Sequence, residues 1–517
     1  MMMDAILIGS YVAAVAIASL RWFRVAQREH YAPGRTVLFA ARWWWSSPVN
    51  RVLVIVAAAA AVAAVAAVAL RTDLALLLAV VTFVAVLAGP AGLPLRGGTA
   101  PLRWTRRLKV VAAFAGVLVL ALVAVAAVTT LWVLPVFAVL HPLVVDLALL
   151  LDVPVERAIA ARYVKEASTR LRRVSPTVIG ITGSYGKTTV KNYTAHLLGR
   201  SRKTLASRKS FNNLLGLTLS VNSDLEPGTE FFVAEMGTYG PGEIAKLCDW
   251  LEPSISAMIA IGPMHLERMG SLDNIAKAKS EILTTAETAV LNVDDERLAP
   301  LADDFAARGG RVVRCSTRAT AADVVVLRND EQLELRVEGA VWTVPVPPVE
   351  LVDINLAIAL GLCVAAGSVP ADLEVAVATL PSVANRMVTT VVENGPTIID
   401  DTYNSNPAGA AFALQRLDEL AAGTGGQRIV VTPGMVELGH EQDEANAELA
   451  RRVAELGAHL VVVGRTNRRP LVDGYRSVAG AAPVTVPDRA AAVEWVRANT
   501  AVGDVVLYEN DLPDHFP

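Results

Sequence analysis

The stretch Thr177-Val-Ile-Gly-Ile-Thr182, followed directly by Gly183-Ser-Tyr-Gly-Lys-Thr-Thr189, decides the fold of the larger part of this chain. Its first six residues are typical of a short buried strand, and a helical pattern continues after the glycines to about Leu198. Glycines between a strand and a helix let backbone N–H groups approach phosphates, and the helix dipole favours an anion there. The segment therefore predicts a phosphate-binding loop, although the usual glycine five residues before Gly186 is here Ile181.

The polar residues of this loop match the demands of ATP binding. Lys187 would reach the β- and γ-phosphates, and the Thr188 hydroxyl would meet the accompanying Mg²⁺. A second apolar strand, Glu230-Phe-Phe-Val-Ala-Glu235, ends in a carboxylate. Ligands gather at the carboxyl ends of strands in an open parallel sheet, so Glu235 is well placed to hold the metal ion. The residues expected to bind ATP and Mg²⁺ here are Gly183, Ser184, Gly186, Lys187, Thr188, Thr189 and Glu235.

The first 155 residues differ in composition from the rest of the chain. The chain has 517 residues, too many for one domain, and its mean hydropathy of +0.43 is high for a soluble enzyme. The first and third apolar segments are short for a hydrocarbon core about 30 Å thick, and the last two predict a hairpin that turns near Thr129-Thr130. Together the segments predict a membrane domain of about five helical spans, at about residues 5–20, 52–70, 74–89, 110–130 and 132–151.

Basic residues are concentrated in two loops of this region, 21–51 and 90–109. The positive-inside rule places both loops in the cytoplasm, so five spans put everything after about Asp152 on the cytoplasmic side of the plasma membrane. Trp43-Trp44-Trp45 and Trp104 in these loops indicate either an interfacial aromatic belt or a site for an anionic lipid head group. The basic residues that would attract such a lipid are Arg42, Arg103, Arg106 and Arg107.

Charge and cysteine content exclude some classes of partner. The chain carries 47 Lys and Arg against 50 Asp and Glu, a net charge of −3, which gives no reason to expect a nucleic-acid partner. Cys248, Cys315 and Cys363 lack the paired spacing of a disulfide framework or a cysteine zinc cluster. This cysteine usage fits a reducing cytoplasm.

Further motifs after residue 175 resemble those of the Mur ligases, and among these the MurF type, which adds D-alanyl-D-alanine to a UDP-muramoyl tripeptide. The match runs from about residue 175 to 517. In chain order the motifs are Thr182–Thr189, Ser210–Asn213, Ala234–Glu243, His265–Gly270, Ala276–Glu281, Leu291–Asp295, Asn385–Met387 and Ile399–Pro407.

The resemblance implies an α/β fold with two domains and a carboxylate–amine ligase activity. An ATPase domain with the phosphate-binding loop would span residues 175–383, and a smaller Rossmann-like domain residues 384–517. They would follow the helical membrane domain, residues 1–155, and a basic linker, residues 156–174. In the implied reaction ATP phosphorylates a carboxylate, an amine attacks the acyl phosphate, and an amide forms with release of ADP and phosphate.

Metal ligands can be assigned by position within the family motifs. With Thr188, Glu235 and His265 look like magnesium ligands. Lys279 matches the family lysine that is carbamylated to make an extra anionic ligand. Without carbamylation, Lys279 would add a positive charge among the metal ions; the alternative is a solvated lysine on a helix face. The residues given a catalytic role by the resemblance are Lys187, Lys279, His265 and Arg386.

Nucleotide contacts are implied in both domains. Asn292 matches a nucleotide-contacting asparagine of the family. Arg386 would meet the γ-phosphate from the C-terminal domain, and Asp401 would contact the ribose. Because these residues belong to different domains, we expect catalysis to require domain closure.

The chain departs from the family pattern in three places. Membrane helices stand where the family has its UDP-sugar domain. In Pro433–Gly439, Gly434 replaces an aspartate, and the C-terminal Lys-Gly-Ser-Arg segment is absent. The chain ends instead in an acidic segment that is either a solvated terminus or a binding site for a cationic amine. Its carboxylates are Glu509, Asp511 and Asp514.

These departures leave the substrates open. The carboxylate would come from an envelope precursor, UDP-linked or lipid-linked, and the amine would be D-Ala-D-Ala or another amino compound; membrane lipids are the other expected partner. Two alternatives are a poly-γ-glutamate-synthase-like ligase and an ATP-driven membrane transport protein. The second is weakened by the near absence of charge in the apolar segments. A third, a catalytically inactive scaffold, is disfavoured by the intact set of site residues.

Overall fold

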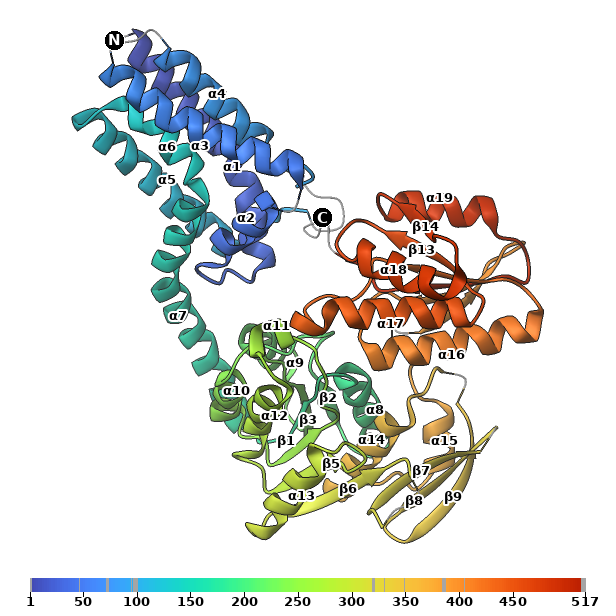
Figure 1. Ribbon diagram of the computed structural model, residues 1–517. Coiled ribbons are helices and arrows are strands. Elements are labelled where there is room, and N and C mark those ends of the chain that lie inside the picture. Colours follow the sequence, from blue (N-terminus) through green and yellow to red (C-terminus); the bar gives the residue numbers. More distant parts are fainter. Residues whose placement is uncertain are drawn as a thin grey trace. The chain divides into compact units, whose positions relative to one another are not determined.

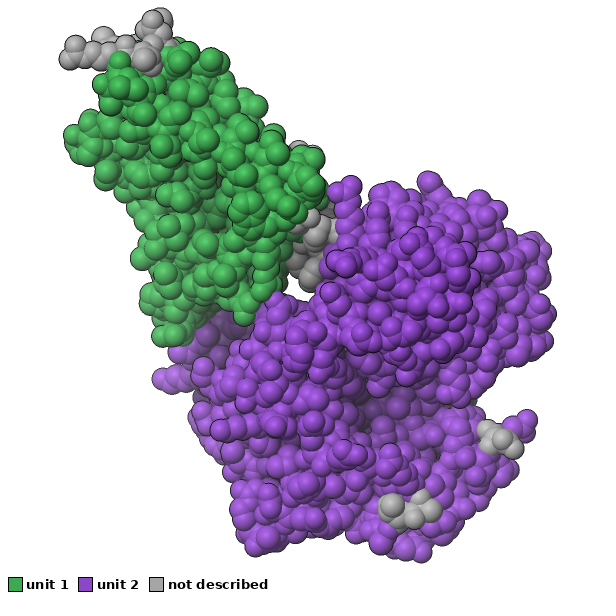
Figure 2. Space-filling view, viewed as in Figure 1, with its two compact units in different colours: residues 1–159, 512–517 green, residues 160–511 purple. Residues whose placement is uncertain are grey.

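The computed structural model of the chain describes residues 2–45, 47–70, 74–93, 95, 101–318, 321–329, 331–347, 349–383, 387–403 and 405–512. Arg386 and Asp514, both singled out above, lie outside these residues. The chain forms two compact units, residues 1–159 with 512–517, and residues 160–511 (Figure 2).

The first unit is helical (Figure 1). By length and composition, three of its described helices, α1, α3 and α5, could each cross a membrane, and η1 and α6 together with the bent-away α7 would make a fourth span. The apolar α4 has 14 residues and is shorter, so a fifth span stays a prediction. The bounds are α1 (Met2–Arg28), α2 (Arg35–Trp45), α3 (Pro48–Ala69), α4 (Ala75–Ala88), α5 (Arg106–Val128), η1 (Leu131–Val133), α6 (Leu134–Val139) and α7 (His141–Val174).

The helix α2 lies in the stretch 21–51, which the sequence predicts to be a loop. The backbone N–H groups of Thr36 and Val37 donate to the carboxylate of Asp146 at 3.3 and 2.9 Å. The first N–H groups of a helix have no partner inside it, and the dipole there favours a negative charge. Asp146, the one acidic residue between Val110 and Leu151, therefore caps a helix.

The predicted helix 132–151 is broken at Leu140, where α6 and α7 meet at a bend of 77°. Pro142 explains the break, because proline has no N–H to continue a preceding helix but is tolerated in the first turn of a new one. From there α7 continues for 34 residues, so the expected linker, residues 156–174, is helical. Its residues Ala167 and Leu171 are buried in the core of the second unit.

The second unit contains two sheets. Among the described residues, the first sheet has nine strands in the order β2-β3-β1-β4-β5-β6-β7-β8-β9, parallel from β2 to β7 and antiparallel from there on. The bounds are β1 (Thr177–Thr182), β2 (Thr204–Ala206), β3 (Phe231–Glu235), β4 (Ile255–Met258), β5 (Thr288–Asn292), β6 (Arg311–Ser316), β7 (Val324–Asn329), β8 (Gln332–Val337) and β9 (Ala340–Pro345).

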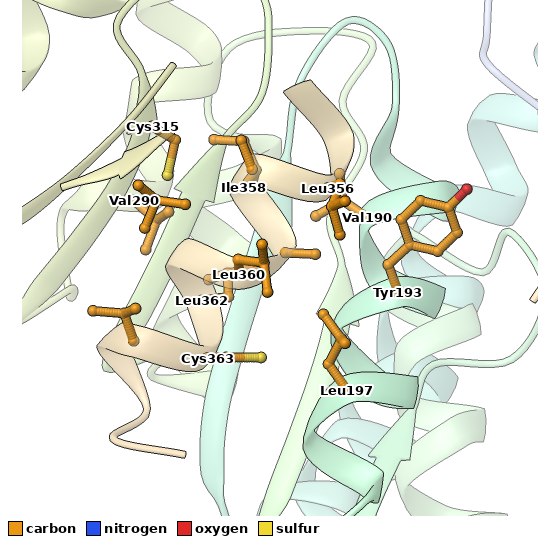
Figure 3. Close-up of a cluster of buried hydrophobic side chains, with 14 of the residues drawn as sticks. Val190, Tyr193, Leu197, Val290, Cys315, Leu356, Ile358, Leu360, Leu362 and Cys363 are labelled. Carbon is orange, nitrogen blue, oxygen red and sulfur yellow. The ribbon is translucent and has the colours of Figure 1, made fainter. Parts of the chain in front are cut away.

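Helices cover both faces of this sheet. On one face, α14 buries apolar side chains against β5 and β6, and α8 packs beside α14 against β1 and β3 (Figure 3). On the other face, α7, α9, α10 and α13 contribute to a second core. The helices are α8 (Lys187–Gly199), α9 (Leu214–Asp224), α10 (Glu243–Leu251), α11 (Leu266–Met269), α12 (Leu272–Ser280), η2 (Glu281–Leu283), α13 (Leu298–Ala307), α14 (Asp353–Ala365) and α15 (Leu373–Ala378). Cys248, Cys315 and Cys363 are buried thiols in these cores.

In the described part of the second sheet, the strand order is β10-β11-β15-β12-β13-β14, parallel except for β10. Helices again lie on both faces. The predicted parallel strands 428–432 and 459–464 are present as β12 and β13. The bounds are β10 (Val388–Val391), β11 (Thr397–Asp401), α16 (Pro407–Thr424), β12 (Arg428–Thr432), η3 (Gly439–Glu441), α17 (Gln442–Glu455), β13 (His459–Val463), α18 (Arg468–Ala479), β14 (Val484–Val486), α19 (Arg489–Asn499) and β15 (Val505–Glu509).

Candidate active site

The predicted phosphate-binding loop connects β1 to the N-terminus of α8, at the carboxyl edge of the first sheet. Gly186 has φ +79°, and a Cβ there would lie 2.4 Å from Oδ1 of Asn355, so only glycine fits. Ser184 fixes the loop: its Oγ donates to the carbonyl of Gly262 at 3.0 Å and accepts from the N–H of Gly262 at 2.9 Å.

Two lysines meet on this loop. Nζ of Lys187 donates to the carbonyl oxygen of Gly183 at 2.7 Å, and Nζ of Lys279 donates to the same oxygen at 3.1 Å. Lys279 is buried, and burial together with the charge of Lys187 lowers the pKa of Lys279 well below the ordinary 10.5. The alternative of a solvated lysine on a helix face is therefore wrong, and the carbamylated ligand stays a prediction.

The Glu235 carboxylate is also buried and has several polar neighbours. Its Oε2 accepts from the Thr188 hydroxyl at 2.8 Å and lies 3.7 Å from Nζ of Lys191, and its Oε1 accepts from Nδ2 of Asn212 at 3.2 Å. Thr188 and Glu235 were predicted to lie together. Neither Lys191 nor Asn212 has a role predicted from the sequence, although Lys191 follows Thr188 by three residues and so shares its helix face.

His265 lies at the N-terminus of α11 on a left-handed backbone, φ +61°. Its Nδ1 is 2.5 Å from Oε2 of Glu437, and its ring packs edge-on against Tyr239 with centroids 4.6 Å apart. Among the described residues, no three His, Cys, Asp or Glu side chains gather closely enough to form a metal centre.

Asn292 is buried at the end of β5. Its Nδ2 donates to the carbonyl of Ile259 at 3.0 Å, and nearby Asp295 accepts from the N–H of Ile261 at 2.8 Å. Asn292 and Asp295 therefore hold the backbone between β4 and His265, which the loop residue Ser184 also contacts at Gly262.

At the carboxyl edge of the second sheet, Asp401 accepts from the N–H of Met387 at 3.3 Å. Glu509 is the neighbouring strand end, wholly buried, and accepts from the Ser405 hydroxyl at 2.5 Å. Burial and the adjacent Asp401 raise the pKa of Glu509 well above its usual 4.5. Asp511 pairs with Arg489. The expectation that the acidic terminus receives an amine is thus not supported at Glu509 or Asp511, since one is enclosed and the other already paired.

Gly434, which replaces a family aspartate, has φ +81° and no room for a side chain. A Cβ would lie 2.3 Å from Oδ1 of Asn446. Buried amides surround it: Nδ2 of Asn467 donates to the carbonyl of Pro433 at 3.0 Å, and Nδ2 of Asn510 donates to the carbonyl of Gly434 at 2.7 Å. In this chain the loop is therefore held by asparagine side chains.

A phosphate-binding loop at a parallel strand end, with a buried carboxylate on the neighbouring strand and two lysines on the loop, defines an ATP-binding α/β protein. Comparison with known proteins gives the family. The Mur ligase middle domain matches residues 181–358, and the Mur ligase glutamate ligase domain matches residues 385–508. The chain belongs to the Mur ligase family.

Relatives and solved structures agree with this assignment. The UDP-N-acetylmuramoyl-tripeptide–D-alanyl-D-alanine ligase of Mycobacterium leprae is 32% identical over 400 residues, 68% of this chain and 74% of that protein. The Escherichia coli ligase of the same name is 28% identical over 300 residues, 56% and 65% of the two chains. MurF from Acinetobacter baumannii shares the fold with a TM-score of 0.59 at 23% identity, over 68% and 77% of the chains. MurF ligase from Thermotoga maritima, in complex with ADP, has a TM-score of 0.57 at 24% identity, over 68% and 80%.

These findings confirm the resemblance to MurF-type ligases. The chain is an ATP-dependent ligase that forms a peptide (amide) bond.

Proposed function

We propose that this chain is a membrane-anchored, magnesium-dependent ligase that activates a carboxylate of a cell-envelope precursor on the cytoplasmic side and joins it to an amine. The cluster at the carboxyl edge of the first sheet supports this most: the Thr188 hydroxyl lies 2.8 Å from the Glu235 carboxylate, and Lys187 and Lys279 share the Gly183 carbonyl. A hydroxyl, a carboxylate and cations at a helix N-terminus are the groups that Mg²⁺ and a triphosphate require.

The reaction has two steps. A carboxylate oxygen attacks the γ-phosphorus of ATP and ADP leaves; the amine then attacks the acyl carbon, loses a proton, and phosphate leaves as the amide forms. Lys187 and the loop N–H groups would hold the phosphates in line, with Arg386 adding a charge from the second domain. Asn292 would contact the nucleotide and Asp401 its ribose. Thr188, Glu235 and His265 would hold Mg²⁺, which would supply further positive charge near the phosphates.

Lys279 is suited to carbamylation. Its lowered pKa favours the neutral amine, which can add to CO₂ and release a proton to give a carbamate. The charge at this position would then change from neutral to negative. The carbamate would pair with the adjacent Lys187 and offer an anionic ligand to the metal ion.

The carboxylate substrate is proposed to be lipid-linked. Of the four arginines predicted to attract its pyrophosphate, Arg107 pairs with Asp152 at 2.8 Å and Arg106 lies 3.9 Å from Glu156. Arg42 and Arg103 are exposed, as side chains that meet an anionic head group must be.

The activity is tested by measuring phosphate release from detergent-purified full chain with lipid-linked and UDP-linked muramoyl peptides, each with D-Ala-D-Ala, other amino acids or amines. Amide product that requires ATP and Mg²⁺, and that is lost in Lys187→Ala, is expected. Nucleotide turnover without any amide product would argue against the ligase assignment and favour the transport alternative. For orientation, reporters fused after residues 35, 100 and 517 should lie inside, and after residues 72 and 130 outside.

A further inference from the structure

A loop of the C-terminal, Rossmann-like domain contacts the turn that carries His265. We define this loop as the 433–439 loop, which runs from the end of β12 to the first residue of η3. Beyond the contact of Glu437 with Nδ1 of His265, Oε1 of Glu437 lies 3.8 Å from Nη2 of Arg268, and its carbonyl accepts from the N–H of Glu267 at 3.3 Å. Gly439 is so close that a Cβ would lie 3.2 Å from the nitrogen of Glu267.

Side-chain hydrogen bonds from two asparagines hold the backbone of the 433–439 loop, which carries Glu437. Oδ1 of Asn446 accepts from the N–H of Met435 at 2.8 Å, and Nδ2 of Asn467 donates to the Met435 carbonyl at 3.0 Å. Glu437 itself has φ +65°, a left-handed conformation that costs a non-glycine residue about 1–2 kcal/mol. Such a conformation persists only where the surroundings impose it, and it is frequent at functional sites.

The contact also determines which nitrogen of His265 is available. A carboxylate can only accept a hydrogen bond, so Nδ1 is the donor in this contact and Nε2 is the ring nitrogen left to meet a metal ion. Carboxylates that orient a metal-binding histidine in this way are common around metal ions. The His265 ring also packs against the ring of Tyr239. The Cζ atom of Arg268 lies 4.9 Å from the centroid of that tyrosine ring. The His265 side chain is 18% exposed, so a ligand can still reach it.

We propose that Glu437 is a positioning residue that orients His265 for Mg²⁺ from the opposite domain, so that the metal site is complete only when the second domain is docked. This inference rests on the proposed role of His265 as a magnesium ligand. With Glu437 in this role, the metal site takes its correct geometry only as the domains close. ATP would then not be used while the domains are apart.

The test measures the Mg²⁺ concentration that half-saturates binding of a fluorescent, non-hydrolysable ATP analogue to the full chain in detergent. Glu437→Ala should raise this concentration about tenfold or more, the usual cost of losing a residue that orients a metal ligand. In a double variant with His265→Ala, Glu437→Ala should not raise this Mg²⁺ concentration any further. With Mn²⁺ in place of Mg²⁺, the electron spin-echo signal of a nitrogen ligand should weaken in Glu437→Ala.

A matched control separates positioning from docking. Arg416, on α16, pairs with Glu350 of the first domain at 2.6 Å, far in sequence from the loop. Arg416→Gln should leave the Mg²⁺ requirement unchanged, and thermal unfolding should show both variants folded. Equal shifts in Glu437→Ala and Arg416→Gln would overturn the inference in favour of docking alone. A shift in His265→Ala without one in Glu437→Ala would also overturn it, whereas no shift in His265→Ala would remove the metal role itself.

Discussion

At the scale of single residues, Lys279 is the side chain whose chemistry depends most on its surroundings. Burial beside Lys187 disfavours its charged form, which favours carbamylation near neutral pH. We expect Lys279→Ala to lose most amide-forming activity and to regain part of it when short carboxylates are added, because they can replace the missing anion. Lys277→Ala, an exposed change on the same helix, is the control and should behave like the wild type. Full activity of Lys279→Ala without added carboxylate would contradict the carbamate.

Glu509 leads to a prediction about stability. Its pKa is raised in the folded state, so below about pH 4.5 the carboxyl is protonated whether folded or unfolded, and it adds no pH dependence there. As the pH rises above that value the unfolded chain releases the proton more easily, and the folded state loses stability. Glu509→Gln keeps an acceptor for Ser405 without a titrating group. In thermal unfolding, the melting temperature of Glu509→Gln should rise relative to that of the wild type as the pH increases. The difference should be about 4 °C for each kcal/mol of stability gained. Parallel curves at all pH values would contradict the buried neutral carboxyl.

Residues of the site differ in how far the sequence could reveal them. Lys187, Thr188 and Glu235 could be placed because each follows a recognisable strand or loop, and parallel strands bring their ends to one edge. Lys191 was missed because its partner depends on the packing of α8 against β3. The contact of Glu437 with His265 joins residues 172 positions apart, and no local pattern indicates it.

At the scale of elements, the 433–439 loop shows why a departure from the family pattern is tolerated. Gly434→Asp restores the family residue but requires φ +81° and collides with Asn446. We expect it to lower the free energy of unfolding by about 2 kcal/mol or more. Gly480→Asp, with φ +70° and open space, carries the conformational cost without the collision and should cost less in urea unfolding. Equal losses would mean that the buried asparagines do not restrict this position.

The predicted bounds of helices were wrong where a single residue, rather than the hydrophobic pattern, determines where a helix begins. Apolar composition alone made 132–151 a single helix, but Pro142 divides it. The helix α2 was missed because its N-terminus is stabilised by Asp146, more than 100 residues later in the chain. Four strands, β1, β3, β12 and β13, were easier to predict, since buried parallel strands are continuous apolar runs.

At the scale of the whole molecule, the two Mur ligase domains are joined to a helical unit. The proposed lipid-linked substrate would account for this combination. Arg42→Gln with Arg103→Gln should raise KM for a lipid-linked acceptor, because each basic residue contributes about 1 kcal/mol to binding at an anionic surface, and two correspond to a factor of about 30. KM for ATP and for a UDP-linked acceptor should not change.

The control for this experiment is a pair of exposed basic residues on the second unit. Arg162 and Lys165 lie on α7 along a groove of about 590 Å³ that is remote in sequence from both arginines. Arg162→Gln with Lys165→Gln removes the same total charge, so a general electrostatic effect on KM would appear equally in both double variants. A rise in lipid-acceptor KM confined to Arg42 and Arg103 would mean that the helical unit selects the substrate. If neither pair alters KM, or if UDP-linked acceptors are used equally well, the helices serve only to anchor the ligase.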